Sequence, residues 1–220
     1  MTIKTQDLSK RFADRTLFSN ANLLFEEGKI YAIVGESGCG KTTLMNLLSL
    51  VDLDFEGKIL YDGVEVKGKT QKEIDAFRNQ GFAFVFSEPF LLDYLDVMEN
   101  VSLPRFVRKQ RIDQMAIEEK AHILGVFDLL DKKVTSLSEG EKQRISVLRA
   151  LMTSSPVLVC DEPTSHLDGS NADRLLHMLL SIAHEQKRTV IVSTHEESTL
   201  PLFDVVYRIK DGRVERLSDE

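Results

Sequence analysis

The sequence has few of the features that mark a secreted, zinc-binding or membrane-spanning chain. Its 220 residues include two cysteines, Cys39 and Cys160, which do not form a pair with zinc-ligand spacing. The N-terminal residues lack a hydrophobic secretion core, and no run of about 18 apolar residues occurs. We therefore expect a protein of a reducing compartment that neither spans a membrane nor is secreted by the usual route.

An excess of positive charge is also missing. The formal net charge is −7, which argues against a dedicated nucleic-acid surface, so we expect no nucleic-acid partner. A chain of this length with 42% hydrophobic residues can bury a substantial core. The composition fits one domain, or one domain with an inserted lobe.

A glycine-rich loop between a strand and a helix is the most informative feature that is present. Residues 35–42 fit the pattern G-x-x-x-x-G-K-[ST], after the apolar run 30–34 and before a helical pattern with Leu44, Leu47 and Leu48 on one face. Backbone N–H groups of such a loop converge on phosphate oxygens, and the helix N-terminus adds positive potential. The alternative is a glycine-rich turn that only caps a helix, but the flanking strand and helix favour a phosphate site.

The predicted nucleotide contacts cover this whole loop. Lys41 supplies a full positive charge, and Thr42 is expected to place its hydroxyl on Mg²⁺. By itself the loop leaves many nucleotide-binding families open. The predicted contacts here are Gly35, Glu36, Ser37, Gly38, Cys39, Gly40, Lys41, Thr42 and Thr43.

The hydrophobic pattern predicts two kinds of sheet and a helical segment. Continuous apolar runs are typical of parallel strands buried on both faces, and they occur at 31–34, 83–86, 157–160 and 190–193. The first 30 residues and residues 57–66 alternate instead and contain turn signals, which predicts an antiparallel sheet. Between about 87 and 136 the pattern is helical, as in 96–103 and 113–124.

Two buried strands are followed by groups suited to nucleotide chemistry. Asp161, at the end of one strand, can hold Mg²⁺ through water while Thr42 binds it directly. Glu162 can accept a proton from the attacking water or orient it. His195 follows another strand and can bond the terminal phosphate and Glu162. The alternative for Asp161 and Glu162 is a solvated pair at a strand end.

Residues 137–144 read L-S-E-G-E-K-Q-R, which resembles the signature of ATP-binding cassette (ABC) ATPases in its variant L-S-G-G-E-x-Q-R. The strand before Asp161 resembles a Walker B strand, residues 165–168 resemble a D-loop, and His195 resembles the switch histidine. These motifs and the P-loop follow the order and spacing of the family over nearly the whole chain. The resemblance implies an enzyme that hydrolyses ATP to ADP and phosphate, with ATP and Mg²⁺ as cofactors.

The expected fold class is therefore α/β. It comprises a P-loop NTPase core with a parallel sheet, an N-terminal antiparallel β subdomain and an inserted helical lobe. We expect a single ABC ATPase domain over 1–220. Its RecA-like core and β subdomain would occupy about 1–86 and 137–220, and its helical lobe about 87–136.

The family resemblance also implies a homodimer in the ATP-bound state. Ser138 and Gly140 would sit at a helix N-terminus that reaches the terminal phosphate held by the other subunit's P-loop, so that two chains sandwich two ATP molecules. Phe12 occupies the place where the family puts an aromatic ring against adenine. The alternative for Phe12 is a core side chain of the first sheet.

Two residues depart from the family pattern. Ser87 stands where the family usually has a glutamine that approaches Mg²⁺ and the attacking water. A bridging water, a rotated Glu88 or looser coupling would follow, and our hypothesis is slower or less tightly coupled turnover. Glu139 replaces the first signature glycine, and we expect its carboxylate to face solvent or the helical lobe, away from phosphate.

Residues 84–86 (F-V-F), 91–92 (L-L) and 97–101 (V-M-E-N-V) resemble the corresponding segments of the lipoprotein-release and macrolide-export group of ABC ATPases. This implies a subunit that powers a separate polytopic membrane permease, exporting or extracting peptides, lipids or drug-like amphiphiles, and that is cytoplasmic and peripheral on the inner face of the cell membrane. The apolar residues 90–95 would form part of a groove for a coupling helix, or else pack the lobe's own core. The alternative function is a soluble or regulatory ABC ATPase, associated with ribosomes or DNA or with a cell-division-type signalling complex, without transport.

Overall fold

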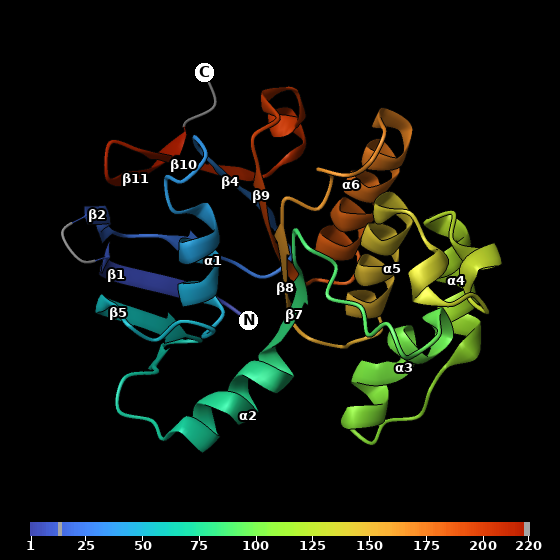
Figure 1. The fold of residues 1–220 in the computed structure, drawn as a ribbon. Coiled ribbons are helices and arrows are strands. Elements are labelled where there is room, and N and C mark those ends of the chain that lie inside the picture. The colour runs from blue at the N-terminus through green and yellow to red at the C-terminus, as the bar shows by residue number, and fades with distance from the viewer. Residues whose placement is uncertain (13–14, 218–220) are drawn as a thin grey trace. The chain divides into compact units, whose positions relative to one another are not determined.

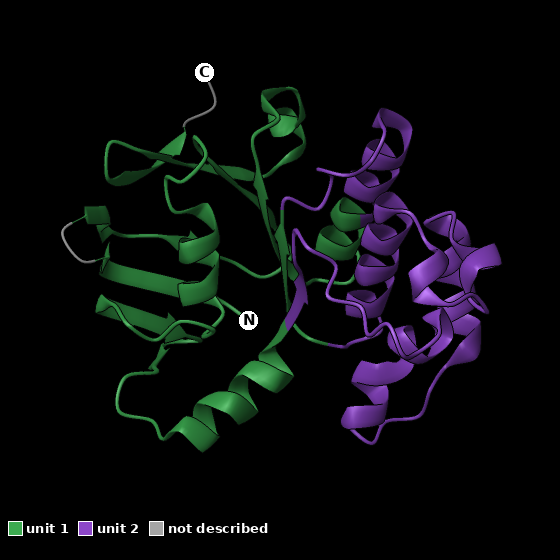
Figure 2. Cartoon of the chain, in the orientation of Figure 1, with its two compact units in different colours: residues 1–82, 155–161, 179–220 green, residues 83–154, 162–178 purple. Residues whose placement is uncertain are grey.

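The computed structural model describes residues 1–12 and 15–217. It divides into two compact units (Figure 2): unit 1 holds residues 1–82, 155–161 and 179–220, and unit 2 holds residues 83–154 and 162–178. The order of the elements along the chain can be followed in Figure 1. The units group the signature helix with the helical segments before it, so the expected division at 87–136 stays a prediction.

The first sheet of unit 1 is antiparallel, as the alternating patterns predicted. Its strand order is β2-β1-β5-β6, and β3 pairs with β1 on the side. In β1, buried and exposed residues alternate, and Ile3 lies opposite both Phe25 and Tyr61. The strands are β1 (Ile3–Phe12), β2 (Arg15–Ala21), β3 (Leu24–Phe25), β5 (Glu56–Tyr61) and β6 (Val64–Glu65).

The second sheet of unit 1 is mainly parallel and carries the phosphate loop. Its order is β11-β10-β4-β9-β8, with all neighbours parallel except β10 and β11. Val34 pairs with Thr194, and Asp161 pairs with Ser193, so three strands end at one edge. The strands are β4 (Ile30–Val34), β8 (Val157–Asp161), β9 (Thr189–Thr194), β10 (Val205–Lys210) and β11 (Arg213–Leu217).

The hydrophobic pattern did not predict three elements of unit 1. Strands β2 and β11 are edge strands with many exposed polar residues, so their apolar signal is weak. Helix α2 (Gln71–Gly81) buries little beyond Ile74 and is fixed at its start by a capping box between Thr70 and Glu73. By contrast, α1 (Lys41–Leu48) buries the predicted leucine face, and the unit also contains η3 (Glu197–Leu202).

Unit 2 is mostly helical, and α3 and α4 cover most of the stretches 96–103 and 113–124 where the pattern predicted helix. Its helices are α3 (Val97–Val107), α4 (Gln114–Ile123), η1 (Phe127–Leu129), η2 (Val134–Ser136) and α5 (Glu139–Leu151). Strand β7 (Phe82–Val85) leads the chain from unit 1 into unit 2, and α6 (Gly169–His184) leads it back. Within residues 1–12 and 15–217, no helix has both the length and the apolar content needed to cross a bilayer.

Candidate nucleotide site

The phosphate loop follows β4 and requires glycine at its first position. Gly35 has a φ of +154°, and a Cβ added there would lie 2.6 Å from both the Cys39 Sγ and the Ile209 carbonyl oxygen. Gly40, which precedes α1, has a φ of +111°. Both positions are hard for other residues to occupy, so the chain can make this sharp turn between strand and helix only with these glycines.

Lys41 lies across this loop. Its side chain is 7% exposed, and its Nζ donates to the carbonyl oxygens of Gly35 at 2.9 Å and Glu36 at 3.3 Å. The ammonium is therefore held by the backbone of the loop at the positive end of α1. A phosphate bound by the loop would meet both the helix N-terminus and a full positive charge.

Thr42 and Asp161 meet directly, although 119 residues separate them in the sequence. The Thr42 Oγ1 donates to the Asp161 Oδ2 at 2.7 Å, and the Ser193 Oγ donates to the Asp161 Oδ1 at 2.5 Å. Hydroxyl and carboxylate oxygens are the hard ligands that Mg²⁺ prefers. The donor set at this edge of the sheet therefore fits a magnesium ion.

Ser193 was not predicted as a site residue. The apolar run 190–193 predicted only a buried strand, and the site residue predicted after it was His195. A signal was nevertheless present, because Ser193 is level with Asp161 across the paired strands β8 and β9. Alignment of the two strand ends would have placed its hydroxyl beside the carboxylate.

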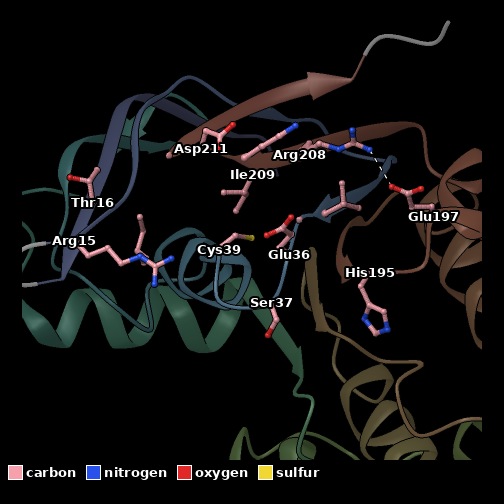
Figure 3. Close-up of a pocket in the computed structure, with 15 residues that line it drawn as sticks. Arg15, Thr16, Glu36, Ser37, Cys39, His195, Glu197, Arg208, Ile209 and Asp211 are labelled. Atoms are coloured by element: carbon pink, nitrogen blue, oxygen red, sulfur yellow. Dashed lines mark ion pairs between the residues drawn. The ribbon is translucent and has the colours of Figure 1, made fainter.

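A cavity of about 600 Å³ lies beside the loop within unit 1 (Figure 3). Its lining includes Glu36, Cys39 and His195, together with two arginines from the flanking strands, Arg15 and Arg208. The Arg15 Nη2 donates to the Gly38 carbonyl oxygen at 3.5 Å, and Arg208 pairs with Glu197 at 3.6 Å. No motif marks either arginine, so sequence reasoning missed both.

Phe12 is not a core residue. Its side chain is 55% exposed, and the Lys10 Nζ lies 5.0 Å from its ring centroid. Lys10 is itself held by Asp52 at 2.8 Å and Asp54 at 3.1 Å. The core alternative for Phe12 is therefore wrong, while its stacking on adenine stays a prediction.

The signature residues of unit 2 begin α5. Ser138 is the N-cap: its Oγ donates to the Glu141 Oε2 at 2.9 Å and accepts from the Glu141 N–H at 3.3 Å. The hydrogen bond from the Ser138 backbone lowers the pKa of the Glu141 carboxyl. A Cβ at Gly140 would lie 2.8 Å from the His166 carbonyl oxygen, so the D-loop requires glycine there. Hydroxyl and amides are thereby gathered at one helix N-terminus.

Glu139 turns away from this cap. Its side chain is 64% exposed and pairs with Lys142 at 2.8 Å, and this hydrogen bond lowers the pKa of the Glu139 carboxyl. The expectation that Glu139 faces solvent is confirmed. The substitution at this signature position therefore leaves the backbone at Gly140 uncovered by the carboxylate.

Glu162 and Ser87 also belong to unit 2. Glu162 has a φ of +44°, which is uncommon for a residue other than glycine. Its carbonyl oxygen accepts hydrogen bonds from the Ser165 N–H at 3.2 Å and from the Ser165 Oγ at 2.9 Å. Ser87 follows Phe86, whose carbonyl oxygen accepts from the Gln143 Nε2 at 3.2 Å. The predicted contacts of Glu162 with His195 and of Ser87 with Mg²⁺ stay predictions.

The chain is similar in sequence to a protein family and to known transport proteins. The family model described as "ABC transporter" matches residues 18–165. The lipoprotein-releasing system ATP-binding protein LolD of Bacteroides thetaiotaomicron is 33% identical over 217 residues, which are 97% of this chain and 99% of LolD. The macrolide export ATP-binding/permease protein MacB of a Shewanella species is 35% identical over 212 residues, which are 93% of this chain and only 32% of MacB.

The fold is also similar to that of a solved ATP-binding cassette. The dimeric post-hydrolysis state of the ATP-binding cassette MJ0796, bound to ADP and Pi, superimposes with a TM-score of 0.89 at 26% identity, covering 99% of this chain and all of that one. The chain belongs to the ABC transporter family. It is an ATP-hydrolysing, nucleotide-binding subunit, with the α/β cassette fold that the motifs predicted.

Proposed function

We propose that two copies of this chain close around ATP and Mg²⁺ and drive a separate polytopic membrane permease. The observation that carries the nucleotide chemistry is the Thr42, Asp161 and Ser193 cluster at the end of the phosphate loop. The dimer is supported by the dimeric state of the similar cassette MJ0796. The permease is supported by the relatives, which are named as parts of lipoprotein-release and macrolide-export systems.

In the bound state, loop amides and Lys41 would hold the phosphates while Thr42 and Asp161 hold the metal. When bound there, Mg²⁺ would neutralise part of the charge of the phosphates. Ser193 would keep the Asp161 carboxylate in place through its hydrogen bond. Phe12, exposed at the end of β1, would cover one face of the adenine.

The remaining groups would act on the terminal phosphate and the attacking water. Glu162 would orient the water and accept its proton, and His195 would hold the terminal phosphate. The partner copy would add the Ser138 hydroxyl and the amides near Gly140 at the N-terminus of α5. ATP then joins the two copies, and hydrolysis separates them.

The permease would dock on the apolar segment 90–95 of unit 2. Phe90 and Tyr94 are largely exposed, and none of the five apolar side chains of this segment is buried. The Arg149 guanidinium donates to the carbonyl oxygens of Pro89 at 2.9 Å and Phe90 at 2.8 Å. The segment is therefore held by α5 while its side chains stay available for a coupling helix.

The proposed place of action is the cytoplasmic, inner face of the cell membrane, where the permease would hold this subunit. The names of the relatives favour peptides, lipids or drug-like amphiphiles as cargo over nucleic-acid work. The alternative of a soluble or regulatory ABC ATPase is not favoured, because these relatives are transport proteins.

Affinity capture tests the proposal. A Glu162→Gln form with ATP is captured from detergent-solubilised native membranes, and bound proteins are identified by mass spectrometry. We expect a polytopic membrane protein, and we expect it to be reduced in a matched capture with Lys41→Ala, which cannot hold the phosphates. Recovery of ribosomal or DNA-repair proteins without a membrane partner would contradict the permease role while leaving the ATPase chemistry intact.

A further inference from the structure

The turn after α3 gathers cations in an otherwise acidic chain. Residues 105–112 read Arg-Phe-Val-Arg-Lys-Gln-Arg-Ile, and no carboxylate occurs between Glu99 and Asp113. The whole chain has a net charge of −7, so this segment is a local excess of positive charge in an acidic protein. We call residues 105–112 the basic tip.

The apolar side chains of the basic tip face solvent. Phe106 is 73% exposed, Val107 is 64% exposed and Ile112 is 43% exposed. Single exposed apolar residues are ordinary on protein surfaces, but a group of them within one turn marks a contact site. The basic tip therefore combines apolar and cationic side chains at one place on unit 2.

Arg105 anchors the basic tip to unit 2. Its Nε donates to the Met152 carbonyl oxygen, at the end of α5, at 2.8 Å, and its Nη1 donates to the Arg111 carbonyl oxygen at 2.9 Å. The Arg105 guanidinium thus links Arg111, at the end of the turn, to the C-terminal end of α5. Lys109 and Arg111 are both exposed, so these two cations face solvent.

The turn itself is closed by its backbone. The Gln110 N–H donates to the Arg105 carbonyl oxygen at 2.9 Å, and the Lys109 N–H donates to that of Phe106 at 3.0 Å. Lys109 has a φ of +53°, which lets the chain reverse at that residue. Because the turn is already formed, a partner that binds it would not have to order it.

We propose that the basic tip contacts the surface of an anionic lipid bilayer. Lys and Arg are attracted by the negative potential of such a surface, while adjacent apolar side chains enter the boundary between headgroups and acyl chains. An acidic protein surface would satisfy the cations but leave Phe106 and Val107 without apolar partners. The inference rests on the proposed function, since a permease-bound subunit works beside a membrane.

Vesicle flotation of the purified, nucleotide-free chain tests the inference. Vesicles of phosphatidylglycerol and phosphatidylcholine in equal amounts are compared with vesicles of phosphatidylcholine alone. We expect binding to the anionic vesicles, weakened by about 0.5 M salt. Lys109→Gln with Arg111→Gln should lower the partition coefficient about 25-fold, because each cation near the surface contributes about fivefold. Phe106→Ser should lower it as well.

Met115→Ser provides the matched control. Met115 is 81% exposed on α4, outside the basic tip, so its loss should leave vesicle binding unchanged. Equal binding to both vesicle types, an unchanged double variant, or an equal loss in Met115→Ser would each overturn the inference.

ATP hydrolysis in solution separates this inference from the proposed function. The double variant lies outside the nucleotide site, so its turnover should equal that of the unmodified chain. If it binds vesicles normally but fails to capture a permease, the basic tip is a protein contact and the lipid inference is wrong. If the chain binds vesicles as expected but captures no permease, the proposed function fails instead.

Discussion

In unit 1 the candidate groups stand at the ends of buried parallel strands and on the first turn of α1, which follows one of them, whereas in unit 2 they stand at a helix cap, in turns and on exposed loops. Thr42, in the first turn of α1, donates a 2.7 Å hydrogen bond to Asp161, and the paired strands β8 and β9 hold Asp161 level with Ser193. The corresponding groups of unit 2, such as Ser138 and Glu162, are held by caps and local turns. We infer from this difference that unit 1 would hold phosphate and metal through groups fixed by its sheet and by α1, while unit 2 would offer its groups to a partner.

Glu162→Gln should give the largest effect on activity. If Glu162 of unit 2 handles the proton of the attacking water, its loss lowers kcat by about 1,000-fold, within the range of general base catalysis. ATP binding, measured with a fluorescent nucleotide, should be retained. The exposed Glu185→Gln is the control and should hydrolyse ATP normally. Comparable turnover in the two variants would refute the assignment of Glu162.

Gly35→Ala should be the most destabilising change in the loop of unit 1. The new Cβ would meet the Ile209 carbonyl oxygen and the Cys39 Sγ at 2.6 Å, so we expect a loss of about 3 kcal/mol in the free energy of unfolding. Gly38→Ala is the matched control, because a Cβ there meets nothing within 4 Å and only the φ of +74° is unfavourable, by about 1 kcal/mol. Urea denaturation measures both, and equal losses would show that the loop is not tightly packed at Gly35.

Ser193→Ala tests whether unit 1 positions its carboxylate. Without the hydroxyl, Asp161 loses the 2.5 Å hydrogen bond, and we expect about a tenfold increase in the Mg²⁺ concentration needed for half-maximal ATPase activity. A merely structural role would lower the activity without moving the Mg²⁺ dependence. The exposed Ser198→Ala serves as the control and should behave like the unmodified chain.

Ser87→Gln should give the smallest effect. If a bridging water now replaces the usual glutamine, a direct contact would remove an ordering cost of about 0–2 kcal/mol and raise kcat about threefold. ATPase assays with and without the permease measure turnover and its coupling. Unchanged values for both would contradict the hypothesis that Ser87 slows or loosens turnover.

In unit 1 the sequence marks a candidate group where a continuous apolar run leads into it. Asp161 follows such a run, and the P-loop pattern marks Lys41 and Thr42 by spacing alone. Ser193 and Arg15 could not be found in this way, because their roles come from strand register and from an edge strand with a polar pattern. The lesson is that periodicity locates strands, while contacts between strand neighbours require the register.

In unit 2 the hydrophobic pattern predicted the helices but not the contacts of their buried polar residues. The helices around Val101 and Ile117 were predicted from their apolar spacing, and both residues are buried. Gln143, which bonds the carbonyl oxygen before Ser87, is fully buried and was not expected to have a role. A polar residue on a buried helix face shows no periodic signal, so its partner is visible only in three dimensions.

The most direct test of the account is the mass in solution of Glu162→Gln with and without ATP and Mg²⁺, measured by analytical ultracentrifugation. We propose that a complete site needs unit 1 of one copy and the α5 N-terminus of another. The account predicts one chain without nucleotide, two chains with it, and one chain in both conditions when Ser138→Arg is added. A Glu162→Gln chain that stays single with ATP, or a Ser138→Arg variant that still pairs, would contradict the claim.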